Sequence, residues 1–71
     1  MNYDYSKLRG RIKEYFGNQS DFAKSLNLSS VSLSHKLNNR ISFTQDEMYK
    51  SMEKLNINKI EICDYFFKLK V

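Results

Sequence analysis

The sequence has no proline, no tryptophan, one cysteine and one histidine. A single cysteine cannot form a disulfide within the chain, and His35 and Cys63 lie too far apart in the sequence to suggest a zinc site. There is also no apolar N-terminal run of the kind found in secretion signals and membrane spans. We therefore expect a reduced cytoplasmic protein with no metal, no cofactor and no contact with membranes.

Groups that could perform catalysis are also scarce. The acidic residues occur as neighbours such as Asp46 with Glu47, or one turn apart like Glu61 and Asp64, with no His or Cys spaced to act as a catalytic partner. Carboxylates in these positions favour helix starts and solubility rather than acid–base chemistry. The sequence thus predicts a protein that is not an enzyme and that binds no small-molecule ligand.

The chain has 71 residues, ten aromatic side chains (Tyr 5, Phe 5) and a formal net charge of +4. We expect one domain over residues 1–71, with a core that buries only about 60% of the unfolded surface. The ten aromatic rings help to stabilise such a small core. The positive charge favours a polyanionic partner.

Helical spacing dominates the chain, and no segment of useful length alternates like a strand. Leu8, Ile12 and Phe16 predict a helix over about 5–16, and a capping box of Thr44 and Glu47 predicts another that ends near residue 55. Between them we expect helices over 19–26 and from residue 30 to about 38, and a last short helix within 58–67. The fold class is therefore all-α. The basic residues of the first helix are expected on its outer side, as a solvated surface or as a DNA contact: Lys7, Arg9, Arg11 and Lys13.

Residues 19–40 predict two short helices that meet at a tight turn. Asn27 can adopt the left-handed backbone conformation that ends a helix, and Leu28 fills the corner. Ser29 or Ser30 then caps the second helix. Ala23 leaves room for the two helices to cross closely.

The second helix has a distinct outer face. Leu33 and Leu37 define its buried side, so that Val31, His35 and Asn38 project roughly opposite. The remaining outer positions are the flanking Ser32 and Ser34, and Ser30 near the helix start. Such compact donors, acceptors and methyl groups suit base edges in the DNA major groove, whereas the flanking Lys36 and Arg40 suit phosphates.

The spacing Gln19, Ala23, Leu28, Ser29, Leu33, Asn38 resembles the lambda repressor-like helix-turn-helix family, especially small Cro-type phage regulators. This chain departs from the family pattern at Asn27, where the family prefers Gly. The family also prefers a second buried position three residues after the first, whereas Leu37 follows Leu33 by four, which predicts a slightly rotated helix. The resemblance implies a compact five-helix domain that contacts bases through Ser29, Ser30, Val31, Ser34, His35 and Asn38. The set expected at the DNA backbone is Gln19, Ser32, Lys36, Asn39 and Arg40.

The function expected from these features is sequence-specific binding of double-stranded operator DNA. The resemblance implies a Cro-like phage or prophage repressor in a bacterial host cell, associated with the nucleoid. A protein-interaction module, such as an antirepressor or an antitoxin-like partner that reuses the fold, is the alternative. A homodimer, including one that forms only on DNA, and a monomer both remain open.

The C-terminal segment allows two interpretations. In the first, Phe66 and Phe67 close the core against the first helix. In the second, alternate residues from Tyr65 to Val71 form an extended dimer contact that includes Phe67 and Leu69. Cys63, Met48 and Met52 are expected in the core.

Overall fold

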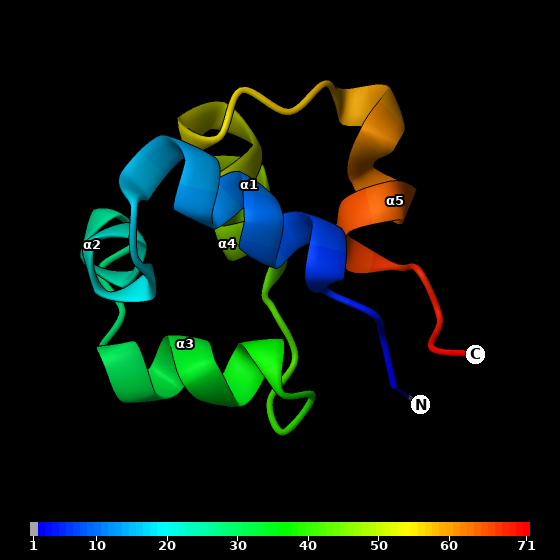
Figure 1. The fold of residues 1–71 in the computed structure, drawn as a ribbon, viewed down its shortest axis with the longest axis horizontal. Helices are drawn as coiled ribbons and strands as arrows, with labels where there is room; N and C mark the ends of the chain where they lie inside the picture. Colours follow the sequence, from blue (N-terminus) through cyan, green and yellow to red (C-terminus); the bar gives the residue numbers. More distant parts are fainter. Residues whose placement is uncertain (1) are drawn as a thin grey trace.

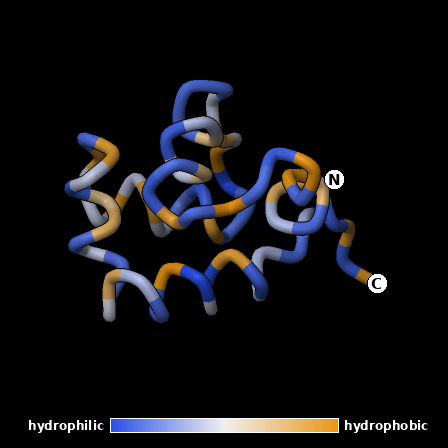
Figure 2. Tube along the Cα trace, turned by 90° about the horizontal axis from the view of Figure 1, so that it is seen from above, coloured by the Kyte–Doolittle hydropathy of each residue, from blue (hydrophilic) through white to orange (hydrophobic). Residues whose placement is uncertain are grey.

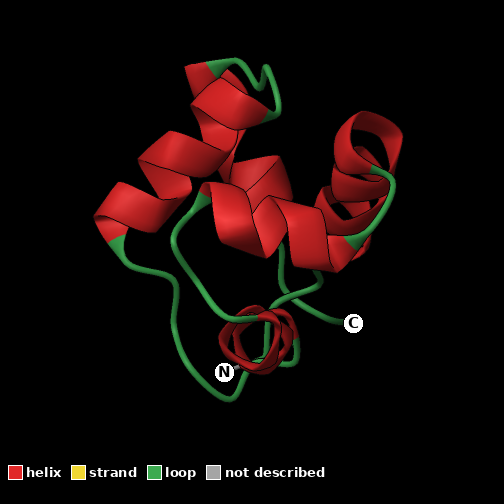
Figure 3. Cartoon of the chain, turned by 90° about the vertical axis from the view of Figure 1, so that its left-hand side faces the viewer, coloured by secondary structure: helices red, strands yellow, loops and turns green. Residues whose placement is uncertain are grey.

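The computed structural model describes residues 2–71 and contains five α-helices (Figure 1). No strand occurs among the described residues, as the cartoon in Figure 3 shows, so the all-α prediction with five helices is confirmed. The last predicted helix is divided into a 3₁₀ turn at Lys59–Glu61 and a helix proper. The helices are α1 Ser6–Phe16, α2 Gln19–Ser25, α3 Ser30–Leu37, α4 Gln45–Lys54 and α5 Ile62–Phe66.

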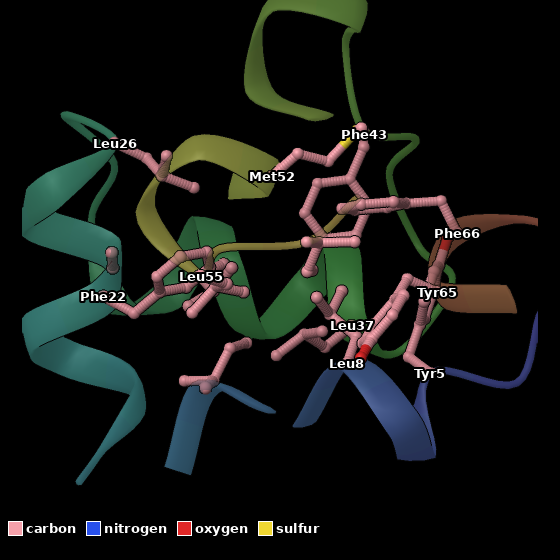
Figure 4. Packing of buried hydrophobic residues seen from close by; sticks show 14 residues of the cluster. Tyr5, Leu8, Phe22, Leu26, Leu37, Phe43, Met52, Leu55, Tyr65 and Phe66 are labelled. Atoms are coloured by element: carbon pink, nitrogen blue, oxygen red, sulfur yellow. The ribbon is translucent and has the colours of Figure 1, made fainter. Parts of the chain in front are cut away.

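Each helix contributes to one hydrophobic core (Figure 4). Figure 2 shows hydrophobic and hydrophilic residues alternating along the helices, as expected where one side of each helix is buried. Phe43, in the loop before α4, packs edge-on against Tyr5 and Phe66, with ring centroids 5.4 and 5.3 Å away. Side chains with almost no exposed surface are Leu8, Ile12, Phe22, Leu33, Leu55 and Phe66.

Two basic residues of α1 hold the C-terminal ends of other helices. Arg11 donates through Nε to Leu55 O (2.9 Å) and through Nη2 to Asn56 O (2.8 Å), just after α4. Arg9 donates through Nη2 to Leu37 O at the end of α3 (3.1 Å). A cation at this position satisfies free carbonyls and interacts favourably with the helix dipole. These two arginines are therefore structural groups rather than part of a purely solvated surface.

The two ends of the described chain lie together beside the end of α3 (Figure 1). Asp4 N–H donates to Lys68 O (2.6 Å) and Lys70 N–H donates to Asn2 O (3.1 Å). Asn39 binds the same segment, because its Oδ1 accepts from Tyr3 N–H (2.8 Å) and its Nδ2 donates to Tyr3 O (3.0 Å). The N-terminal segment is thus hydrogen-bonded both to the C-terminal segment and to Asn39.

Two expectations for the C-terminal region need correction. Cys63 is exposed rather than buried, because Tyr65 and Phe66 occupy the inner side of α5. Phe66 closes the core as predicted, but Phe67 leaves 43% of its surface exposed. Met52 is buried and Met48 packs against the core from a partly buried position.

Within residues 2–71, no helix is long and apolar enough to cross a membrane. The same residues contain no group of three or more acidic, His or Cys side chains suited to hold a metal ion.

Candidate binding face on helix α3

The turn between α2 and α3 has the predicted geometry. Asn18 caps α2, since its Oδ1 accepts from Asp21 N–H (2.8 Å). Asn27 has a φ of 58°, in the left-handed region, and Leu28 N–H donates back to Ala23 O (2.9 Å). Ala23 is completely buried. A small residue here allows α2 and α3 to pack closely, as expected from the sequence.

Hydroxyl groups fix the start of α3. Ser29 is the cap, because its Oγ accepts from Ser32 N–H (3.0 Å). Ser20 of α2 and Ser30 of α3 are hydrogen-bonded through their hydroxyls (3.0 Å). Two of the three serines predicted to contact bases, Ser29 and Ser30, are therefore exposed but already have a partner within the protein.

Helix α3 forms the lower edge of the molecule in Figure 1 and is seen end-on in Figure 3, with its inner side packed against α2 and the core. Val31 is 64% exposed, Asn38 is exposed, and Ser34 and His35 are partly buried. Asn38 Nδ2 donates to Ser34 Oγ (3.3 Å), and Asn38 Oδ1 accepts from Arg9 (3.1 Å). We call Ser29, Ser30, Val31, Ser34, His35 and Asn38 the α3 face.

Lys36 does not flank the α3 face, where its place in the sequence had predicted it. Only 6% of Lys36 is exposed, and its Nζ donates to Ser42 O (3.0 Å) and pairs with Glu47 Oε1 (3.0 Å). The side chain follows Leu33 by three residues, so its methylene groups pack on the buried side of the helix. The prediction that Lys36 flanks the α3 face and reaches a phosphate is wrong. The inner side of α3 thus contains both spacings: Lys36 follows Leu33 by three residues, and Leu37 follows it by four.

The other residues predicted at the DNA backbone differ in how accessible their side chains are. Both polar atoms of the Asn39 side chain are bonded to Tyr3, so its expected position at the DNA backbone also needs correction. Ser32 is partly buried and its hydroxyl accepts from Ser29 (3.0 Å). Gln19 is partly buried, and Arg40 is exposed just after α3.

Lys13, expected either on a solvated surface or at DNA, lies close to the position of Gln19. Lys13 and Gln19 line the same hollow of about 190 Å³ at the junction of α1 and α2. The signal in the sequence was the Gly17-Asn18 break, since a short turn there brings the last turn of α1 beside the start of α2. Lys13 is exposed.

The electrostatics behind the α3 face centre on Glu47. Burial alone would raise the pKa of the Glu47 carboxyl, but the hydrogen bonds from Thr44 N–H and Lys36, with the charge of Lys36, outweigh burial and lower it. Thr44 and Glu47 also form the predicted capping box of α4. One carboxylate therefore joins the start of α4 to the inner side of α3.

Glu47 should make the stability of the protein depend on pH on the acid side. Because its pKa is lower in the folded state, Glu47 contributes stability above its unfolded pKa, and this contribution is lost as the pH falls through the folded pKa. Urea unfolding at a series of acidic pH values should show this loss, and Glu47→Gln should flatten it. Equal acid sensitivity in both proteins would contradict this role.

The fold and the α3 face define a small all-α protein whose polar helix surface is suited to a macromolecular partner. No curated protein matches the chain. The chain belongs to the family described as "Protein of unknown function (DUF739)", whose model matches residues 1–69. It is also similar to the modulator of repression (MOR) of the temperate bacteriophage TP901-1 from Lactococcus lactis, whose solution structure has been determined. The two are 42% identical with a TM-score of 0.83, covering 100% of this chain and 96% of the other.

Proposed function

We propose that this protein is a phage or prophage regulator that modulates repression through its α3 face. Support comes from the similarity to a phage modulator of repression over the whole chain. The structural observation that carries the proposal is the outer side of α3, which presents short polar and methyl-bearing side chains next to a tight turn with φ 58° at Asn27. Such a surface approaches a partner closely without long charged side chains in between.

Operator DNA is the target that the arrangement of α2 and α3 favours. A helix presented in this way inserts into the major groove in lambda repressor-like helix-turn-helix proteins, and we place this protein among them as a Cro-like regulator. In this mode Ser30, Val31, Ser34, His35 and Asn38 select the sequence. Gln19, with Lys13 beside it, and Arg40 dock on phosphates at either end of α3, and occupancy of the site blocks a promoter.

A repressor protein is the second candidate target, and the charge of the site favours it. Lys36 and Asn39 are bonded inside the protein and Arg9 is bonded to the end of α3. This leaves Arg40 as the exposed cation directly after α3. DNA affinity depends strongly on such cations, whereas a nearly uncharged polar surface is also suited to a protein partner. In this mode the regulator would change repression by binding the repressor itself.

Selection of bound sequences from a random DNA pool, followed by salt titration of the best sequence, tests the DNA mode. An enriched sequence, bound more weakly as salt rises, supports operator binding. The repressor mode is tested by titrating the purified repressor of the same phage or prophage into the protein in a calorimeter. Binding there, with no enriched DNA sequence, would replace the first target by the second.

His35→Ala should distinguish base contact from general docking. If His35 contacts a base, the substitution should cost about 1 to 3 kcal/mol on the selected operator and little on random DNA. Fluorescence anisotropy with both DNAs measures the difference, and Asn2→Ala, at an exposed residue outside the α3 face, serves as the control. Equal losses on both DNAs would remove His35 from the base-contacting set.

A further inference from the structure

Helices α4 and α5 enclose an apolar groove that the α3 face does not use. The groove has a volume of about 590 Å³. Its apolar lining is Met48, Tyr49 and Met52 from α4, with Ile62 and Phe67 from α5 and its end. The polar lining is Gln45, Asp46 and Lys59.

Exposed apolar side chains belong to the segments that line this groove or follow them directly in the sequence. Tyr49 is 52% exposed, and Ile60, in the 3₁₀ turn between two lining residues, is 87% exposed. Leu69, two residues after Phe67, is 50% exposed. Apolar residues that gather on one surface mark a site of protein contact more often than isolated ones do.

The charges beside the groove have opposite signs and no ionic partner among residues 2–71. Neither Asp46 nor Lys59 takes part in any of the salt bridges of the described chain. The Lys59 ammonium lies 5.7 Å from the centroid of the Tyr49 ring, at the edge of the apolar lining. The surface therefore contains a hollow, a projecting apolar residue, an acid and a base.

We propose that this groove is the contact surface for a second copy of the chain. In a two-fold dimer the same patch serves both partners, so it must be complementary to itself. Ile60 of one copy then enters the groove of the other, and Asp46 of each copy pairs with Lys59 of its partner. A standard interface takes roughly 800 Å² from each partner, a modest share of the 4766 Å² surface of this small protein.

The dimer leaves the α3 faces free, because no residue of α3 lines the groove and α3 lies away from α4 and α5 in Figures 1 and 3. Two α3 faces in one particle would contact two half-sites of DNA or two copies of a protein target. The inference therefore does not depend on which target the α3 face binds.

Sedimentation equilibrium of the protein alone tests the proposal, with Asp46→Lys and Lys59→Asp as the informative variants. The unmodified protein should pass from monomer to dimer as its concentration rises. Each single variant places like charges opposite each other and should weaken dimerisation at least about tenfold. An equimolar mixture of the two variants restores both opposite-charge pairs and should dimerise about as well as the unmodified protein.

Lys24→Asp, a charge reversal at an exposed residue of α2 outside both the groove and the α3 face, is the matched control and should leave dimerisation unchanged. The mixture also controls for folding, because it contains the same two chains that fail to associate separately. A protein that stays monomeric at all concentrations would overturn the proposal and leave the groove to another partner. Dimerisation that neither single variant weakens, or that the mixture does not restore, would overturn it as well.

Discussion

Lys36→Ala should destabilise the protein by about 3 to 5 kcal/mol, because it removes one partner of a buried ion pair. The Lys36 and Glu47 side chains are only 8% and 16% exposed, and their charged atoms are 3.0 Å apart. The alanine also deletes the methylene stem that packs beside Leu33 and Leu37 on the inner side of α3. A loss of this size is comparable to the whole stability of many small domains. Urea unfolding followed by circular dichroism measures it.

Lys36→Met is the informative companion, since it keeps the apolar stem and removes only the charge. If Glu47→Gln is added, the carboxylate that would be left buried without a counter-ion is replaced by a neutral amide, and much of the loss should be recovered. A Lys36→Ala protein of normal stability whose DNA binding had become less salt-dependent would contradict the internal position of this side chain. That result would return Lys36 to the phosphate contacts.

Phe66→Ala should cost about 3 to 5 kcal/mol, and Phe67→Ala much less, although the two residues are adjacent and chemically identical. Phe66 is 2% exposed and packs edge-on against Phe43, so its removal leaves a cavity in the core. Phe67 is 43% exposed, and its ring lies edge-on to Tyr3 at 5.9 Å. Thermal and urea unfolding of both variants measure the difference. Similar losses would mean that the C-terminal segment packs differently from the structure.

The residues whose positions could be predicted from the sequence interact with residues close to them along the chain. The capping box of Thr44 and Glu47, the left-handed Asn27 and the paired Leu33 and Leu37 each depend on a spacing of four residues or fewer. Local spacing determines such contacts whatever the rest of the molecule does. This is why the five helices and the buried side of α3 could be predicted.

The residues that were misplaced are bonded to distant parts of the chain. Asn39 is bonded to Tyr3, and Lys36 is paired with Glu47 across the loop that precedes α4. A basic or amide side chain looks solvent-exposed in a helical wheel, and only the packing of another element shows that it has a buried partner. The same limit applies to Arg9, whose acceptor at Leu37 lies on another helix.

The anchoring of α3 has a consequence for how such regulators diversify. Its attachments are Leu33, Lys36 and Leu37 on the inner side, with Ser29 at the start and Arg9 at the end. Val31 is 64% exposed and takes no part in this attachment, so substitutions there should be nearly neutral for folding. At Val31 the contact surface is therefore separable from the anchoring of the helix, whereas Ser29 and Asn38 take part in both. A new target preference could then arise, or be engineered, by exchanging outer residues of α3 on an otherwise unchanged protein.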